Sequence, residues 1–168
     1  MIPIIIMIVS LFLDGLLSNY LPFLVNDLSL FTPMFTVVSI FILYPFFRKS
    51  EKKYYIFLFI VGVIYDLLYT NLVFLDGCLF VVLGFISYSI QKTFNYNYLK
   101  NILYAIIMVC SYEIIYAFIL LVYNMVPITL SGVVYKISHS LIINIIYFEL
   151  LYIIINFIPK KYKKISLN

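Results

Sequence analysis

The sequence contains only 11% charged residues, whereas hydrophobic residues make up 65% of its 168 positions and the mean hydropathy is +1.14. A water-soluble domain of this length cannot bury so much apolar surface. Regular alternation of apolar and polar residues is also missing, because the apolar runs are continuous, and this argues against a membrane β-barrel. We therefore predict an all-α integral membrane protein.

Residue types and motifs that commonly serve in catalysis or metal binding are also rare in this sequence. The sequence has one histidine, His139, and two cysteines, Cys78 and Cys110, which show no metal-ligand spacing. It has no His-Glu-x-x-His pair, no Gly-x-Ser-x-Gly nucleophile turn and no phosphate-binding glycine loop. An enzyme needs such groups gathered at one depth of the membrane. We therefore predict no enzymatic activity, cofactor or metal, and we interpret the histidine and the cysteines as packing residues.

Six apolar stretches approach the roughly 20 residues that a transmembrane helix requires. The segments between them are too short for a soluble domain, so residues 1–168 are predicted to form a single transmembrane domain of six helices. The predicted spans are residues 2–18, 32–47, 54–70, 72–90, 102–125 and 134–158.

Basic residues gather on one side of these spans. Ten of the eleven Lys and Arg residues lie in three segments, 48–53, 91–100 and 159–168, and the remaining one is Lys136. Because loops rich in Lys and Arg stay in the cytoplasm, both termini and these three basic segments are predicted to be cytoplasmic. The net charge of +4 suits loops beside anionic lipid and does not require a nucleic-acid partner.

Four acidic residues lie within the predicted spans, and a fifth, Asp76, begins the fourth span. An acidic side chain in hydrocarbon costs about 2.5 to 3.5 kcal/mol on insertion scales, and it normally faces the bundle interior or a partner. Three interpretations are open: the acids hold helices together, they form a proton or ion pathway, or they contact another membrane protein. The four residues are Asp14, Asp66, Glu113 and Glu149.

Two further features concern the surroundings of these acids. Gly62 precedes Asp66 by one helical turn, so this helix face allows close backbone approach beside a hydrogen-bonding group. Lys136 is the one basic residue predicted on the outer side, and we expect it to pair with Asp14 or Asp66, where water is scarce. The sixth span carries polar residues on two nearly opposite sides, which predicts that it packs centrally.

Similar sequence segments recur at the predicted outer ends of three spans: "DGLLSNYLPFL" from Asp14, "DLLYTNLVFL" from Asp66 and "LLVYNMVPI". Two interpretations are open. Asparagine could end each helix in a C-terminal cap, or the chain could contain a true repeat of helical hairpins. The third copy has Ile119 where the first two have aspartate. The asparagines, 52 and 53 residues apart, are Asn19, Asn71 and Asn124.

Residues 20–31 are too apolar for a freely solvated loop, yet they include Pro22, Asn26 and Asp27. We predict that this loop lies along the outer membrane interface or tucks into the bundle. Together with the outer ends of the first and third spans, it is expected to bind a partner protein, with Phe23 and Leu28 as contact positions.

The arrangement of spans and several segments resemble the MreD family. The basic turn "RKSEKKYY", the third span ending "GVIYDLLYTNLVFLDG" and the opening "DGLLSNYLPFLVNDLSLFTPMFTVVSIFILYPFF" are similar to the firmicute-type branch, and the resemblance covers nearly the whole chain. The family often has a Pro-Leu-Gly turn where this chain has "NLVFLDG". The most specific match is a Gly-x-x-x-Asp-Leu-Leu pattern formed by Gly62, Asp66, Leu67 and Leu68.

This resemblance implies a scaffold of the bacterial cell-wall elongation complex in the cytoplasmic membrane. Its implied partners are an MreC-like protein, a RodA-type glycosyltransferase, a penicillin-binding transpeptidase, the MreB filament and membrane lipid. It also implies a fold similar to the substrate-binding subunits of energy-coupling-factor transporters. The alternative function is therefore a small-molecule-binding subunit of such a transporter, but the small residues through which those subunits dock are missing from the first helix, "IPIIIMIVSLFLDG".

Overall fold

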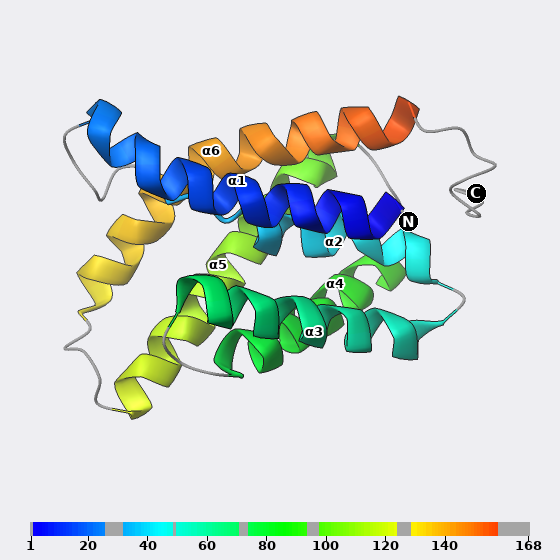
Figure 1. Cartoon of the computed structure of the whole chain (residues 1–168), viewed down its shortest axis with the longest axis horizontal. Helices are drawn as coiled ribbons and strands as arrows, with labels where there is room; N and C mark the ends of the chain where they lie inside the picture. The colour runs from blue at the N-terminus through cyan, green and yellow to red at the C-terminus, as the bar shows by residue number, and fades with distance from the viewer. Residues whose placement is uncertain are drawn as a thin grey trace.

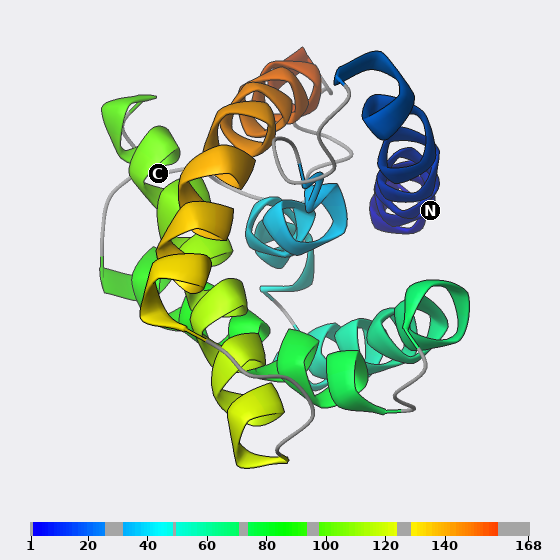
Figure 2. The same ribbon diagram turned by 90° about the vertical axis from the view of Figure 1, so that its left-hand side faces the viewer.

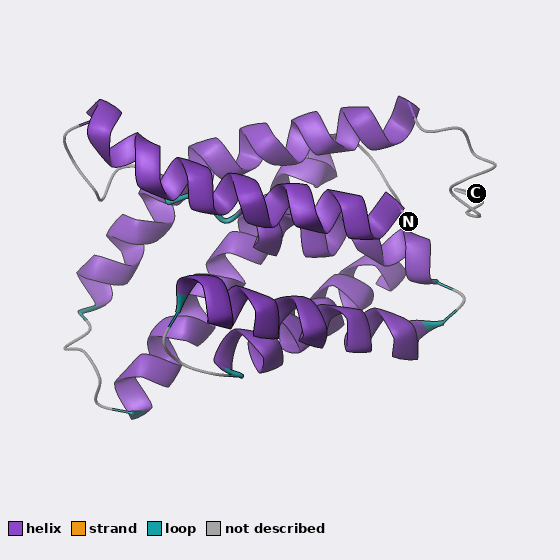
Figure 3. Ribbon diagram, in the orientation of Figure 1, coloured by secondary structure: helices purple, strands orange, loops and turns teal. Residues whose placement is uncertain are grey.

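A computed structural model of the chain describes residues 2–25, 32–48, 50–70, 74–93, 98–123 and 129–157. These residues form six α-helices joined by short connections, and no strand occurs among them (Figures 1 and 3). The helices are α1 (Ile2–Val25), α2 (Phe35–Phe47), α3 (Glu51–Tyr69), α4 (Leu75–Thr93), α5 (Tyr98–Val122) and α6 (Leu130–Phe157).

Four of these helices contain a segment long and apolar enough to cross a membrane: Ile2–Tyr20, Leu75–Lys92, Ile102–Val122 and Leu130–Phe157. The prediction of a helical membrane protein is confirmed at this level. α2 has 13 residues and is about 20 Å long, against a hydrocarbon core of about 30 Å. α3 is long enough, but charged residues at its start and Asp66 lower its apolar character. The prediction of six spans is therefore not confirmed by length and composition.

α2 lies at the centre of the bundle. It contacts each of the other helices, which surround it when the molecule is viewed along their length (Figure 2). All residues from Phe35 to Pro45 are buried, so α2 packs on every side. Its position explains how a helix of this length can belong to a membrane protein: other helices, and not lipid, cover it.

The prediction that the sixth span packs centrally is wrong. α6 buries one face, which carries Ser140, Asn144, Phe148, Leu151 and Ile155. On its other side, Ser138 donates its hydroxyl to the Tyr135 carbonyl oxygen of the same helix at 2.8 Å. A hydroxyl that bonds to its own helix needs no polar interior, so polarity on two sides of a span did not indicate burial.

Pro45 interrupts the hydrogen bonds of α2 in a way that α4 compensates. Because proline has no N–H, it cannot donate to the carbonyl oxygen four residues earlier, which belongs to Phe41. The Gln91 side chain of α4 reaches this oxygen through Nε2 at 2.6 Å. The bond satisfies a buried acceptor and ties the middle of α2 to the last turn of α4.

The backbones of α3 and α4 touch at two glycines. A Cβ atom added to Gly62 would lie 2.5 Å from the Asp76 carbonyl oxygen and 2.6 Å from the Gly77 Cα atom. The predicted close approach at Gly62 is therefore confirmed. It brings the carboxyl group of Asp66, one turn further along α3, up to the first turn of α4.

α1 is longer than predicted. It continues to Val25, so the first part of the predicted loop at residues 20–31 is helical, while residues 26–31 lie outside the described structure. Pro22 does not end the helix, because a proline within a helix removes one hydrogen bond and membrane helices tolerate this loss. Asn19 is therefore not a helix end, and the C-terminal-cap interpretation of the asparagines is wrong at this copy.

Candidate intramembrane polar site

Asp14 holds the start of α2. Its Oδ1 accepts a hydrogen bond from the Phe35 N–H at 2.7 Å, and its Oδ2 accepts from the Thr36 N–H and hydroxyl at 2.9 and 2.6 Å. The first N–H groups of a helix have no partner within that helix, and Met34, at the cap position, provides no side-chain bond. Asp14, 2% exposed, therefore caps α2 from a neighbouring helix and places a negative group at the positive end of the helix dipole.

Asp66 holds the start of α4 in the same way. Its Oδ1 accepts from the Asp76 N–H at 3.1 Å, and its Oδ2 accepts from the Gly77 N–H at 3.3 Å. The hydroxyl of Thr70, the residue that follows α3, donates to Oδ1 at 2.8 Å. Like Asp14, Asp66 is buried and supplies the acceptors that the following helix lacks at its own start.

Both aspartates cap the helix that follows, and this explains why two of the three similar sequence segments begin with aspartate. In the hairpins α1–α2 and α3–α4, the aspartate of the first helix caps the second helix. α6 uses a local residue instead: the Thr129 Oγ1 accepts from the Gly132 N–H at 3.2 Å. The side chain of Ile119, at the corresponding place in α5, contains no hydrogen-bond acceptor. The structure therefore supports a repeat of the first two hairpins, whereas Asn71 and Asn124 lie outside the described residues.

Asp76 follows directly in this network. It is the second residue of α4 and is 0% exposed. Its Oδ1 accepts from the Tyr112 hydroxyl of α5 at 3.1 Å, whereas its Oδ2 has no hydrogen-bond partner within the described structure. Three helices thus meet at one cluster of carboxyl and hydroxyl groups.

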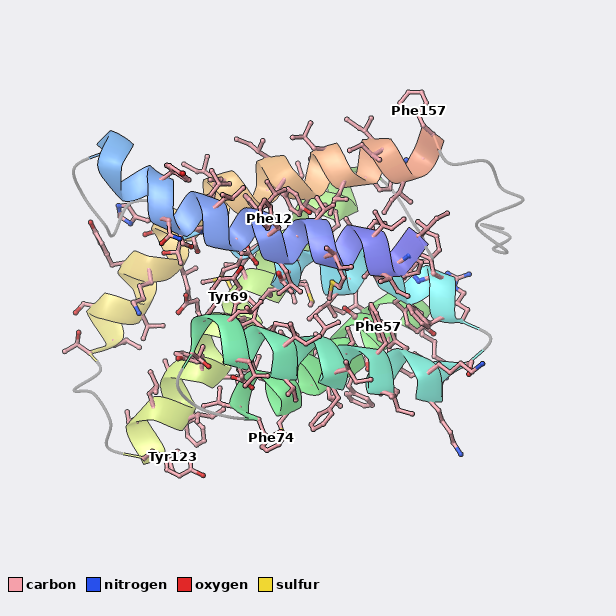
Figure 4. The ribbon with its side chains drawn as sticks, viewed as in Figure 1. Phe12, Phe57, Tyr69, Phe74, Tyr123 and Phe157 are labelled. Carbon is pink, nitrogen blue, oxygen red and sulfur yellow. The ribbon has the colours of Figure 1, made fainter. Side chains whose placement is uncertain are left out.

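Two smaller connections complete the polar layer. The Asn144 side chain of α6 accepts from the Met34 N–H at 2.8 Å and donates to the Thr32 carbonyl oxygen at 3.1 Å. Tyr69 of α3 donates to the Leu11 carbonyl oxygen of α1 at 2.6 Å, and its ring packs against Gly15 (Figure 4). The start of α2 is therefore held from both α1 and α6, and α1 is joined to α3.

The expected pairing of Lys136 with Asp14 or Asp66 is wrong. Lys136 is exposed, and in the described part of the chain both carboxylates are bound by N–H and hydroxyl groups. Helix starts provide uncharged donors at the required positions, so no cation has to be desolvated. The carboxyl group with which Lys136 interacts electrostatically is that of Glu113 on α5.

The remaining predicted site residues are not part of this layer. Both carboxyl oxygens of Glu149 are buried, with no hydrogen-bond partner in the described regions. The residue lies eight positions before the end of α6, about 12 Å along the helix. Phe23 falls within α1, but its side chain is outside the described structure, as is the whole of Leu28.

Some contributors carry no signal in the sequence. Thr36 and Tyr112 are ordinary residue types in apolar helices, and their partners are 22 and 36 residues away. The His139 ring packs against the Tyr135 ring in a tilted arrangement, with ring centroids 3.9 Å apart. Among the described residues, no group of three or more His, Cys, Asp and Glu side chains is arranged to hold a metal ion.

These features define a helical membrane protein whose buried acids fasten one helix to the next. The family model for the rod shape-determining protein MreD matches residues 1–161. The chain belongs to the MreD family and is a rod shape-determining membrane protein, as the sequence resemblance indicated. No curated protein and no solved structure matches it.

Proposed function

We propose that this protein is a non-enzymatic scaffold of the cell-wall elongation complex in the bacterial cytoplasmic membrane. It binds an MreC-like membrane protein and helps regulate peptidoglycan synthesis by a RodA-type glycosyltransferase and a penicillin-binding transpeptidase, together with MreB. It crosses the membrane six times with both termini in the cytoplasm, in a fold similar to the substrate-binding subunits of energy-coupling-factor transporters. Membership of the MreD family supports this proposal.

The use of the buried acids is the observation that carries the proposal. The carboxyl oxygens of Asp14 and Asp66 accept hydrogen bonds from backbone N–H groups of other helices. A general acid, a general base or a transport site needs a group free to meet a substrate. These two carboxylates build the bundle instead, so a function in binding has to use the outward faces of the helices.

The outer halves of α1 and α3 form a suitable surface. Tyr69 and Gly15 join the two helices, and large apolar side chains stand exposed on either side of this junction. We define the outer α1–α3 surface by its exposed residues Phe12, Leu16, Leu67 and Leu68. A transmembrane helix of the MreC-like partner can pack here by van der Waals contact, which is the main source of helix association in lipid.

Site-directed photocrosslinking in cells tests this assignment. A photoreactive residue at Phe12 or Leu67 is expected to crosslink to a co-expressed MreC-like protein. The matched control is Ile142 on α6, which is 60% exposed and lies two residues from Asn144, at the level of the α2 start. Crosslinks from Ile142 but not from Phe12 or Leu67 would move the interface to α6. No crosslink from any of the three, with normal membrane insertion, would contradict partner binding through these helices.

A further inference from the structure

Two carboxyl groups lie together, out of water, where α3 meets α4. Asp66 and Asp76 are 1% and 0% exposed, and the Asp66 carboxyl group accepts a hydrogen bond from the backbone N–H of Asp76 itself at 3.1 Å. Gly62 makes this approach possible, because its missing Cβ lets the Asp76 backbone lie directly against α3.

The hydrogen bonds of the two groups are unequal. Asp66 accepts three bonds, from the N–H groups of Asp76 and Gly77 and from the Thr70 hydroxyl. Asp76 accepts one bond, from the Tyr112 hydroxyl to Oδ1, and its buried Oδ2 has no partner among the described residues. An acceptor left unpaired beside another acceptor is unfavourable in a low-dielectric interior.

Within the described part of the chain, no positively charged side chain acts on Asp76. The side chains that interact electrostatically with Asp76 include three tyrosines from α3 and α5: Tyr65, Tyr112 and Tyr116. Two ionised carboxylates side by side repel each other strongly when water and cations are absent. One additional proton removes the repulsion and converts the unpaired Oδ2 into a donor.

We propose that Asp66 and Asp76 bind a single proton between them, carried on Oδ2 of Asp76 and donated to the Asp66 carboxylate. Asp66 is the acceptor because its carboxyl oxygens already accept three hydrogen bonds, whereas one oxygen of Asp76 accepts none among the described residues. Asp76 then uses both oxygens, one accepting from Tyr112 and the other donating to Asp66. The proton thereby completes a hydrogen-bonded chain from α5 through α4 to α3. This proposal does not depend on the identity of any partner protein.

Infrared spectroscopy of the full-length protein in lipid vesicles tests the protonation directly. With 13C-labelled aspartate, a protonated carboxyl group gives a C=O stretching band that shifts with the label, which separates it from the glutamates. We expect this band at neutral pH in the wild-type protein and in Asp14→Asn, and its loss in Asp76→Asn. If the wild-type protein has no label-sensitive band, or if the band persists in Asp76→Asn, the proposal is overturned.

Stability provides a second, independent measurement. Asparagine mimics a neutral carboxyl group in shape, so Asp76→Asn should leave the Tm nearly unchanged. Asp66→Asn replaces one acceptor oxygen of a carboxyl group that accepts three bonds by a donor, and it should lower the Tm clearly. Equal losses in the two variants would contradict the assignment of the proton to Asp76. If Asp76→Asn fails to fold, the infrared band of the labelled wild-type protein still decides. Absence of that band together with a Tm raised by Ca2+ or Na+ would assign the pair to a cation and overturn the proposal.

Discussion

The first two hairpins and the third one solve the same physical problem differently. In α1–α2 and α3–α4, a buried aspartate of the first helix caps the second helix, whereas α6 begins with its own Thr129 in an exposed position. Correspondingly, residues 114–122 of α5 and 130–139 of α6 include no buried side chain. A cap supplied by a neighbouring helix fixes both helices together, while a local cap leaves the pair free to diverge from the bundle, as the end of α5 and the start of α6 do (Figure 1).

The largest expected effect is the loss of an aspartate cap. Asp14→Ala leaves the N–H groups of Phe35 and Thr36 and the Thr36 hydroxyl without an acceptor in the bundle interior. At about 1 to 3 kcal/mol for each unsatisfied buried group, shared partly by relaxation, we expect a loss of about 3 to 5 kcal/mol of unfolding free energy. Denaturation of the purified protein in mixed micelles measures it. A loss below that of Thr129→Ala would refute the contrast between the hairpins.

Gly62 is the next most sensitive position. Gly62→Val places atoms against the Asp76 and Gly77 backbone, which cannot rotate away, and we expect a loss of about 2 to 3 kcal/mol. Gly132→Ala is the matched control in the third hairpin, because its nearest neighbour is the exposed Thr129 Oγ1 at 3.2 Å. The same denaturation assay should show little change or a slight gain for this control. Comparable losses in both variants would show that the close α3–α4 contact is unimportant.

The bond between α4 and α2 provides a double-mutant cycle. Gln91→Leu leaves the buried Phe41 carbonyl oxygen unsatisfied and should cost about 1 to 3 kcal/mol. In a Pro45→Ala background, the new backbone N–H at position 45 can bond to this oxygen, so the same change should cost much less. Thermal unfolding of the four proteins measures the coupling. Additive effects would mean that Gln91 does not compensate for the proline.

The cap of the third hairpin should matter less. Thr129→Ala removes an N-cap acceptor for Gly132 in an exposed position, where water replaces it. We expect a loss of about 1 kcal/mol or less of unfolding free energy. Thr129→Ser serves as the control, since it keeps the hydroxyl. A loss as large as that of Asp14→Ala would remove the distinction between neighbour-supplied and local caps.

The smallest expected effect concerns Lys136. Because it is exposed and binds neither Asp14 nor Asp66, Lys136→Met should change the unfolding free energy by less than about 0.5 kcal/mol. Combined with Asp66→Asn, its effect should be additive. Rescue of Asp66→Asn by Lys136→Met would restore the ion pair expected from the sequence and contradict the contacts described here.

Several features were readable from residue types and spacing. The continuous apolar runs indicated helices in a membrane, and Gly62 one turn before Asp66 indicated a close helix contact. Asp14 and Asp66 lie in the bundle interior, which was one of the interpretations that the sequence left open. Their hydrogen-bond partners were not predicted. A sequence shows which side chains are charged, but it does not show which backbone N–H groups at helix starts lack a partner. Lys136 was therefore the expected counter-ion. The central helix was also misassigned, since burial on all sides depends on neighbours.

The sequence by itself determined that the protein lies in a membrane and that it is helical, because both properties follow from composition and from the length of the apolar runs. It also determined the family, through motifs that span the chain. Only the tertiary structure decided what the aspartates bind. The backbone donors lie 10 to 22 residues further along the chain, at the starts of α2 and α4. A carboxylate reaches these donors only when packing has brought the start of one helix beside another helix. Local sequence patterns do not show which helix start will lie near which carboxylate.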